Sequence, residues 1–259
     1  MKKAAVIVGA SSGIGEQTAY KLASLAEQEG IDRIFLVARR EALLEKVANK
    51  VDEISTKALS AVCCGDITDN DFLCSLTAQL ADEFEVTWLI YSAGCGFYGN
   101  VDTVPSEKSC LCTELNCTSA VRTTVHFLPY INSGGRIIQL ASGAAFFPQP
   151  GFAVYAASKA FVLSFSRALR RELKPRKISV TAVCPGPCET EFLKIASNGK
   201  KIPEYKRLFM TSPVSVAEKA IKAALKDKGI CFPTFSMRLL YLASKVIPAS
   251  WVMFFQSKL

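Results

Sequence analysis

The sequence predicts an α/β fold: a doubly wound parallel sheet of about seven strands with helices on both faces. Short apolar runs alternate with longer amphipathic segments along the 259 residues. Nearly continuous apolar strands separated by helices are typical of a parallel sheet that is covered on both sides. A glycine-rich turn also follows the first apolar run directly, and a doubly wound sheet has its first ligand-binding turn at this point.

The predicted strands are apolar runs rich in β-branched residues and bounded by turn-forming or charged residues. They span residues 3–9, 33–38, 58–64, 86–92, 135–142, 178–184 and 229–235. Between them, apolar residues recur at helical spacing. This spacing predicts helices at 13–29, 41–53, 69–83, 106–128, 153–174 and 215–227. Right-handed crossovers then join the strands into a single Rossmann-type domain over residues 1–259.

The charge of the chain is compatible with several classes of partner. Half of the residues are hydrophobic, and the net charge is +8. A basic protein can bind nucleic acid, a membrane surface or an anionic small ligand. The basic residues are spread along the chain, however, and their densest run, 167–177, is best interpreted as the solvated end of a helix. We therefore expect no nucleic-acid partner.

The cysteines indicate a reduced protein without a metal site. The chain has ten cysteines and one histidine, His126, and no Cys-x-x-Cys pair, which leaves little for a zinc site. Several cysteines lie in apolar runs, where reduced cysteine behaves as a small buried hydrophobe. The start, MKKAAVIVGA, has too short an apolar run for a signal peptide and is better interpreted as a first strand. We expect a cytoplasmic protein.

The turn after the first strand reads Gly9-Ala10-Ser11-Ser12-Gly13-Ile14-Gly15. Glycines at a strand–helix junction let the backbone turn sharply and approach a pyrophosphate, while the helix N-terminus supplies free N–H groups. The spacing is G-x-x-x-G-x-G, and such a triplet can also serve packing alone. Its place after the first strand favours dinucleotide binding.

Arg39 and Arg40 end the second strand, where NAD-binding sheets have an acidic residue for the ribose 2′-hydroxyl. Two guanidinium groups attract a 2′-phosphate instead. NADP(H) is therefore the preferred cofactor and NAD(H) the alternative. The non-functional interpretation is that the two arginines are a basic pair flanking the next helix. Asp66, after the third strand, can accept from an adenine amino group or form the turn that Asp-x-Thr often makes.

A serine and a Tyr-x-x-x-Lys pair follow the fifth strand. Ser142 ends this strand, and the next helix carries Tyr155 and Lys159. The carboxyl ends of parallel strands line the ligand crevice of an open sheet, so Ser142 is expected to face a ligand. Residues four apart share a helix face, but such pairs are also common on solvated surfaces. The neighbouring motifs decide between the two interpretations.

Taken together, these residues resemble the short-chain dehydrogenase/reductase family. The motifs arrive in the family's order along most of the chain: Gly9 to Gly15, Asp66 with Ile67, Ala93-Gly94, Asn116, Ser142, Tyr155, Lys159, Pro185-Gly186 and Thr190. The resemblance implies a core at 1–190 with the cofactor and catalytic residues, and a substrate lid and helix at 191–228. The apolar tail after the last strand looks like that of the bacterial DltE-type reductases.

The resemblance implies a role for each catalytic residue. Tyr155 is the general acid that protonates the carbonyl oxygen as hydride arrives at carbon, and the Lys159 ammonium lowers the phenol pKa from its usual value of about 10. Lys159 also reaches the nicotinamide ribose. Ser142 hydrogen-bonds the substrate oxygen, and Asn116 holds a water that links Lys159 to solvent. The nicotinamide carboxamide is fixed by Pro185, Gly186 and Thr190.

The chain departs from the family pattern at a few positions. Val8 stands where the family usually has threonine, and Tyr91-Ser92 stand where it commonly has two asparagines. These are mainly structural positions, so the departures affect local hydrogen bonding more than catalysis. Ser12 also lacks the basic side chain that some NADP-binding members carry there. Discrimination between the cofactors is thus left to the two arginines after the second strand.

Aromatic residues predict the class of substrate. The segments after strands four to six contain Phe97, Phe147, Phe152 and Phe192, which favours a lipophilic ketone or aldehyde unless these rings only pack the lid. We expect the lid, 191–212, to be mobile until ligands bind. An NAD(P)+-dependent alcohol or hydroxysteroid dehydrogenase working oxidatively is an alternative. A non-catalytic cofactor-binding regulator is another, which the intact catalytic set disfavours.

The tail, 236–259, is apolar but interrupted by Arg238, Lys245 and Pro248, so it is a poor membrane-spanning helix. Three roles are open for it: peripheral contact with a membrane, a cap on the substrate cleft, or a packing or dimer contact. The family resemblance implies a homodimer or homotetramer that packs through the helices at 106–128 and 153–174.

Overall fold

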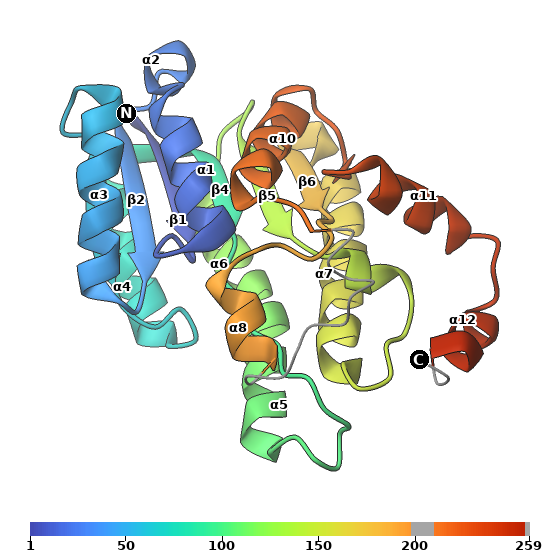
Figure 1. Ribbon diagram of the computed structural model, residues 1–259. Coiled ribbons are helices and arrows are strands. Elements are labelled where there is room, and N and C mark those ends of the chain that lie inside the picture. Colours follow the sequence, from blue (N-terminus) through green and yellow to red (C-terminus); the bar gives the residue numbers. More distant parts are fainter. Residues whose placement is uncertain (198–209, 257–259) are drawn as a thin grey trace.

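The first strand lies in the middle of the sheet. The computed structural model in Figure 1 describes residues 1–197 and 210–256, with 254–256 described by their backbone alone. Seven strands form one sheet in the order β3-β2-β1-β4-β5-β6-β7, and every neighbouring pair is parallel. They are β1 Lys2–Val8, β2 Arg33–Ala38, β3 Ser60–Cys64, β4 Phe84–Tyr91, β5 Arg136–Leu140, β6 Ser179–Val183 and β7 Ile230–Cys231. The predicted doubly wound sheet is confirmed.

Helices cover both faces of this sheet (Figure 1). α1 contacts α3 and α10, and α6 contacts α4. The helices are α1 Gly13–Ala23, α2 Ala26–Glu29, α3 Glu41–Ser55, α4 Asn70–Ala81, α5 Ser106–Thr113, α6 Ser119–Phe127, α7 Ala153–Glu172, α8 Glu191–Ser197, α10 Pro213–Leu225, α11 Phe235–Ala243 and α12 Ala249–Gln256. Strand order reverses between β1 and β4, and a doubly wound sheet opens its ligand crevice at such a reversal.

β1 shows why the strands are apolar on both faces. Successive side chains of a strand point to opposite sides of the sheet. Ala5 and Ile7 pack into one core cluster, which includes residues of α1, α3 and α10. Ala4, Val6 and Val8 pack into a second cluster, with residues of α4 and α6. All five are buried, so a continuous apolar run is required here rather than an alternating one.

Local capping chemistry moves two of the predicted boundaries. The last strand was expected at 229–235 but covers only Ile230–Cys231, since Pro233 follows and the Thr234 side chain accepts from Met237 N to begin α11. The helix expected at 215–227 begins earlier, at Pro213. Ser212 caps it by accepting from Ser215 N, and proline is favoured at a first helical position.

The helix expected at 106–128 is interrupted in its middle. Between α5 and α6, residues Glu114–Thr118 form a π-helical turn. The phenol of Tyr91, one of the residues that depart from the family pattern, donates 2.6 Å to Leu115 O inside this turn. π turns widen a helix locally and are frequent at functional sites. This one holds Asn116.

The tail folds into two short helices that lie at one end of the molecule (Figure 1). α11 and α12 are separated by a turn that contains Pro248. No helix in the described ranges, 1–197 and 210–256, is long and apolar enough to cross a membrane. Phe146, Phe232 and Tyr241 hold α11 against the body of the protein through edge-to-face and tilted ring contacts.

Candidate active site

One large cavity of about 1660 Å³ opens along the carboxyl ends of the strands. A pocket for a single ligand has a volume of roughly 300–1,000 Å³, so this cavity has room for more than one small molecule. Most of the predicted site residues line it: Gly9, Ser11, Ser12, Gly13, Ile14, Arg39, Arg40, Asp66, Ile67, Ala93, Gly94, Phe97, Ser142, Phe152, Tyr155, Lys159, Pro185, Gly186, Thr190 and Phe192. Three predicted residues are absent from its wall: Gly15, Asn116 and Phe147.

The glycine turn brings the backbone close to the end of β4. Gly9 has a φ of +85°, and a Cβ atom there would lie 2.6 Å from Ala93 N. A Cβ on Gly15 would lie 2.1 Å from Gly9 O, so this glycine packs the turn from behind instead of lining the cavity. Ser12 is the N-cap residue of α1 without a side-chain cap bond. The N–H groups of the first turn are therefore available to an anion.

Both arginines after β2 reach the cavity, and each meets a carboxylate. Arg40 Nη1 lies 2.7 Å from Glu191 Oε2 of α8, and Arg40 Nη2 donates to the hydroxyls of Ser11 and Ser12 at 3.3 and 3.0 Å. Arg39 Nη1 lies 3.6 Å from Asp66 Oδ2. Glu191 was not predicted as a site residue. No local pattern indicates this role, because Arg40 and Glu191 are 151 residues apart in the chain.

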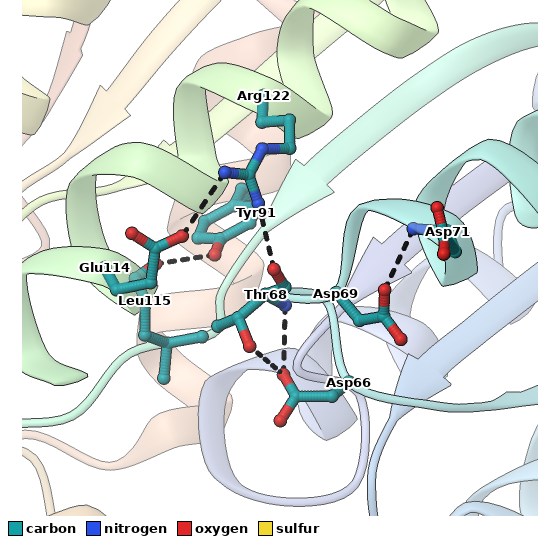
Figure 2. A network of polar contacts seen from close by, with 8 residues as sticks. All are labelled: Asp66, Thr68, Asp69, Asp71, Tyr91, Glu114, Leu115 and Arg122. Carbon is teal, nitrogen blue, oxygen red and sulfur yellow. Dashed lines mark hydrogen bonds and ion pairs between the residues drawn. The ribbon is translucent and has the colours of Figure 1, made fainter.

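Asp66 forms the predicted turn and also faces Arg39. Its Oδ1 atom accepts from Thr68 N and Thr68 Oγ1 at 2.9 and 2.8 Å (Figure 2). Burial raises the pKa of this carboxyl, but the Thr68 hydrogen bonds and the charge of Arg39 outweigh burial and hold the pKa below its usual value. Figure 2 also shows Arg122 of α6 between Thr68 O, at 2.9 Å, and Glu114, at 3.5 Å. The loop after β3 is thereby fastened to the π turn.

Asn116 joins the segment after β4 to α7. Its Oδ1 accepts from Cys95 N at 2.9 Å, while Nδ2 donates to Cys95 O at 2.8 Å and to Ser158 Oγ at 2.9 Å. Ser158 in turn donates to Tyr155 O at 2.8 Å. Cys112 Sγ also lies 3.1 Å from Cys95 O. The buried amide of Asn116 is thus engaged by protein groups, which makes it a positioning residue behind the cavity wall.

Tyr155 lies in a stack of aromatic rings. Phe152 stacks on it with ring centroids 4.4 Å apart, and Tyr98 stacks on Phe152 at 4.1 Å. The Phe192 ring lies 5.3 Å from that of Tyr155. A Cβ atom on Gly96 would come within 2.6 Å of the Tyr155 ring. The phenol is therefore fixed by close packing from several sides.

The charge relationship of Tyr155 and Lys159 differs from the expected one. Burial raises the pKa of Tyr155 above its usual value, although a hydrogen bond with the Ser142 side chain acts in the opposite direction. Burial lowers the pKa of Lys159 to about 8. Lys159 Nζ lies 5.8 Å from the centroid of the Tyr155 ring, and it donates to Leu140 O at 2.7 Å. For both residues, the loss of contact with water on burial is the largest cause of the change in pKa.

Ser142 lies just beyond β5 with its side chain buried beside the cavity. Its Oγ accepts from Ala144 N at 3.1 Å, which caps the short 3-10 turn Gly143–Phe146. The strand expected at 135–142 ends at Leu140, so Ser142 belongs to a capped loop. This capping fixes the hydroxyl near the phenol.

The predicted substrate residues divide into two groups. Phe97, Phe152 and Phe192 line the cavity, whereas Phe147 is buried outside its wall, following the end of the 3-10 turn. Part of the lid expected at 191–212 lies outside the described residues. Thr211, near the end of this lid, pairs in a parallel bridge with Cys188, which precedes it. Residues of α11 also line the wall, in agreement with one of the three roles that the sequence leaves open for the tail, a cap on the cleft: Met237, Leu239, Leu240 and Ala243.

Residues 3–201 match the family model described as short chain dehydrogenase. The chain belongs to the short-chain dehydrogenase family. Among curated relatives, serine 3-dehydrogenase of Agrobacterium fabrum is 32% identical over 203 residues, which are 76% of each chain. The 11-beta-hydroxysteroid dehydrogenase 1A of Arabidopsis thaliana is 34% identical over 194 residues, 73% of this chain and 53% of that protein.

Solved structures agree with this short-chain dehydrogenase fold. A short-chain dehydrogenase from Sphingobium yanoikuyae, in complex with NADPH, superposes with a TM-score of 0.78 and is 25% identical, over 100% of this chain and 94% of the other. The chain is thus an NAD(P)-dependent oxidoreductase that acts on CH–OH and C=O groups, as predicted. Its placement among the DltE-type reductases stays a prediction.

Proposed function

We propose that this short-chain dehydrogenase reduces a ketone or aldehyde of a lipophilic substrate, with NADP(H) as its cofactor. The observation that carries the proposal is the convergence of Ser142, Tyr155 and Lys159 on one wall of the cavity that the glycine turn also lines. The cavity has room for a dinucleotide and a substrate together.

The residues of the cavity suit a dinucleotide with a 2′-phosphate. The turn at Gly9 admits close approach of a pyrophosphate, and α1 offers N–H groups that no side chain caps. Arg39 and Arg40 place two guanidinium groups at the end of β2, where a 2′-phosphate is recognised in such sheets. The NADPH in the Sphingobium yanoikuyae enzyme is consistent with this choice.

The chain's own residues divide the chemistry of reduction. Bound NADPH supplies the hydride. Tyr155 gives its phenolic proton to the carbonyl oxygen, and its raised pKa keeps that proton in place until the oxygen becomes basic. The Ser142 hydroxyl holds the same oxygen. Lys159 binds the nicotinamide ribose, and its lowered pKa near 8 suits proton exchange close to neutrality. Thr190 and the Pro185-Gly186 turn orient the carboxamide.

Apolar side chains favour a lipophilic substrate. Phe97, Phe152 and Phe192 line the cavity, and so do Leu239 and Leu240 of α11. The names of the relatives include both serine and hydroxysteroid dehydrogenases; the aromatic wall fits the second kind of substrate. Oxidation of the corresponding alcohol by NADP+ uses the same residues and is the second candidate function.

The proposal is tested by NADPH oxidation with a panel of ketones, aldehydes and ketosteroids, with NADH as the parallel cofactor. We expect turnover on apolar carbonyls and loss of about 10²–10⁴-fold in kcat for Tyr155→Phe. Equal activity of wild type and Tyr155→Phe would rule out the catalytic assignment. A preference for polar hydroxy acids or amino acids would rule out the lipophilic class.

We also propose a homodimer or homotetramer that packs through α5, α6 and α7. Exposed apolar side chains on two of these helices support this arrangement: Val125 on α6 and Phe161 on α7. Light scattering of the purified chain, with Val125→Asp and Phe161→Asp as interface variants, measures the assembly. A monomer at all concentrations would contradict it.

A further inference from the structure

The helix α11 has two functional faces. Ser236, Leu240 and Ala243, spaced one helical turn apart, line the large cavity. Phe235, Leu239 and Leu242 follow the same spacing on an adjacent face and are exposed. Leu239 lines the cavity and is also exposed, so it lies at the rim between the cavity and the outer surface. One helix therefore connects the substrate cavity with an exposed apolar surface.

This apolar surface continues beyond α11. The turn after the helix exposes Val246, of which 84% is accessible, and Ile247; α12 then exposes Trp251, at 65%. We call the set the tail face: Phe235, Leu239, Leu242, Val246, Ile247 and Trp251. In Figure 1 both helices lie at the periphery, away from the sheet. Several large exposed apolar residues within one segment of 17 residues are typical of an interaction site.

The charges around the tail face have one sign. From residue 228 to residue 259 the chain contains no aspartate or glutamate, whereas Arg238 and Lys245 are exposed among the apolar side chains. An aromatic and aliphatic surface interspersed with cations is typical of helices that lie in the interface of an anionic membrane. A second copy docked on this same surface would bring cations together without carboxylates from 228–256 to pair with them.

We propose that the tail face docks on the surface of a membrane that contains anionic lipid. The helix α11 then lies against the lipid with one face and closes the cavity with the other. A lipophilic substrate dissolved in the membrane reaches Tyr155 past Leu239 and Leu240 without crossing water. The proposal rests on the proposed function only for this route of the substrate; the docking itself does not depend on turnover.

Docking is measured by co-sedimentation of the full chain with vesicles of phosphatidylcholine alone and of phosphatidylcholine mixed with phosphatidylglycerol. We expect binding to the mixed vesicles that weakens with added salt, and little binding to the neutral ones. The variant Val246→Asp should lower the partition coefficient about tenfold, and Leu242→Asp with Val246→Asp should abolish binding, since each adds a buried charge to the lipid contact.

Val214→Asp is the matched control for Val246→Asp. It is the same substitution at another exposed valine, since Val214 lies on α10, away from the tail, and is 48% exposed. It should bind vesicles as wild type does. Leu242 and Val246 do not line the cavity, so the double variant should reduce a water-soluble carbonyl compound at the wild-type rate. If wild type, the double variant and the control all fail to reduce the carbonyl compound, the proposed function is contradicted. The vesicle-binding result would still stand.

Tryptophan fluorescence gives a second readout that needs no substrate. The chain has two tryptophans: Trp88 is fully buried in β4, and Trp251 is exposed on α12. Mixed vesicles should shift the emission to shorter wavelength in wild type but not in Trp251→Phe. Equal sedimentation of wild type and the double variant, or no shift with wild type, would overturn the proposal. A dimer in solution that Val246→Asp dissociates, without vesicle binding, would assign the tail face to a second copy instead.

Discussion

The ammonium of Lys159 donates a 2.7 Å hydrogen bond to the carbonyl oxygen of Leu140, the last residue of β5. Lys159 is buried in α7, one helical turn after Tyr155. Its bond to Leu140 fixes the amine at the carboxyl edge of the sheet, where the cavity lies. The same burial lowers its pKa to about 8, which has a consequence for stability.

Lys159→Met should make the pH dependence of this burial visible. The folded-state pKa of Lys159 is about 8, below the unfolded value of about 10.4. Between these two values the unfolded chain binds more protons, so the free energy of unfolding contributed by Lys159 rises with pH across this window and is lowest below pH 8. We expect wild type to gain up to about 3 kcal/mol relative to Lys159→Met from pH 8 to 10.5.

Denaturant unfolding of both proteins at several pH values measures that difference. Comparison with the variant is needed because the buried cysteines titrate in the opposite sense. Burial raises the pKa of Cys63 to about 11 and that of Cys184 to about 12, so their contribution to stability falls as pH rises above the unfolded pKa near 8.5. If the difference in free energy of unfolding between wild type and Lys159→Met is constant from pH 7 to 10.5, burial does not destabilise the charged form of Lys159.

Gly96→Ala should displace Tyr155, the proposed general acid. The added Cβ would lie 2.6 Å from Tyr155 Cδ2 and 3.0 Å from Phe152 Cζ, so the stacked rings must shift. We expect a fall in kcat of at least about tenfold, because misplacement by an ångström costs this much or more, with the Kd for NADPH unchanged. Gly134→Ala controls for the general cost of a glycine substitution: its Cβ meets nothing within 4 Å, but Gly134 has a φ of +90°, so the variant should be less stable while keeping wild-type kcat. If both variants keep wild-type kcat, the packing does not position Tyr155.

Glu191→Gln should strengthen binding of the phosphorylated cofactor. The Glu191 carboxylate lies 2.7 Å from Arg40 and repels a 2′-phosphate that approaches the same guanidinium. Its removal should lower the Kd for NADPH a few-fold, in line with an exposed ion pair of about 0.2–1 kcal/mol, and leave the Kd for NADH unchanged. Glu189→Gln, two residues earlier and exposed, is the matched control. If Glu191→Gln changes the Kd values for NADPH and NADH equally, Arg40 does not bind the 2′-phosphate.

Arg39→Asp combined with Arg40→Ala should shift cofactor preference towards NADH. Two positive charges are lost at the end of β2, and a carboxylate is added where a ribose 2′-hydroxyl can donate to it. The ratio of kcat/KM for NADPH and NADH measures the shift. The 2′-phosphate assignment fails if this ratio stays at its wild-type value.

Asn116→Ala should destabilise the protein by about 1–3 kcal/mol. The substitution leaves Cys95 N–H without its acceptor and Ser158 without the amide donor. Ser158→Ala removes the contact with Asn116 and the bond to Tyr155 O, but it keeps both bonds between Asn116 and Cys95 and should cost less, about 1 kcal/mol. Thermal unfolding of the two variants measures this order. A neutral Asn116→Ala would mean that water replaces the amide and that Asn116 does not hold the two segments together.

Much of the site was predictable because its residues follow consecutive strands. Gly9, Arg39, Asp66, Gly94 and Ser142 each come at the end of a parallel strand, and the ends of such strands meet at one edge of the sheet. Sequence order and topology then place them around one cavity. The family's Tyr-x-x-x-Lys spacing needs only one helix to bring Tyr155 and Lys159 to the same side.

The amino-acid sequence by itself thus determined the sheet, most of the helices and the residues of the glycine turn and the strand ends that line the cavity, since these depend on periodicity and local turn chemistry. Tertiary structure alone decided the pairing of Arg40 with Glu191, the clamp of Asn116 on Cys95 and Ser158, and the place of α11 in the cavity wall. Each of these joins segments far apart in the chain. Such contacts are selected by packing and desolvation, which no local pattern records.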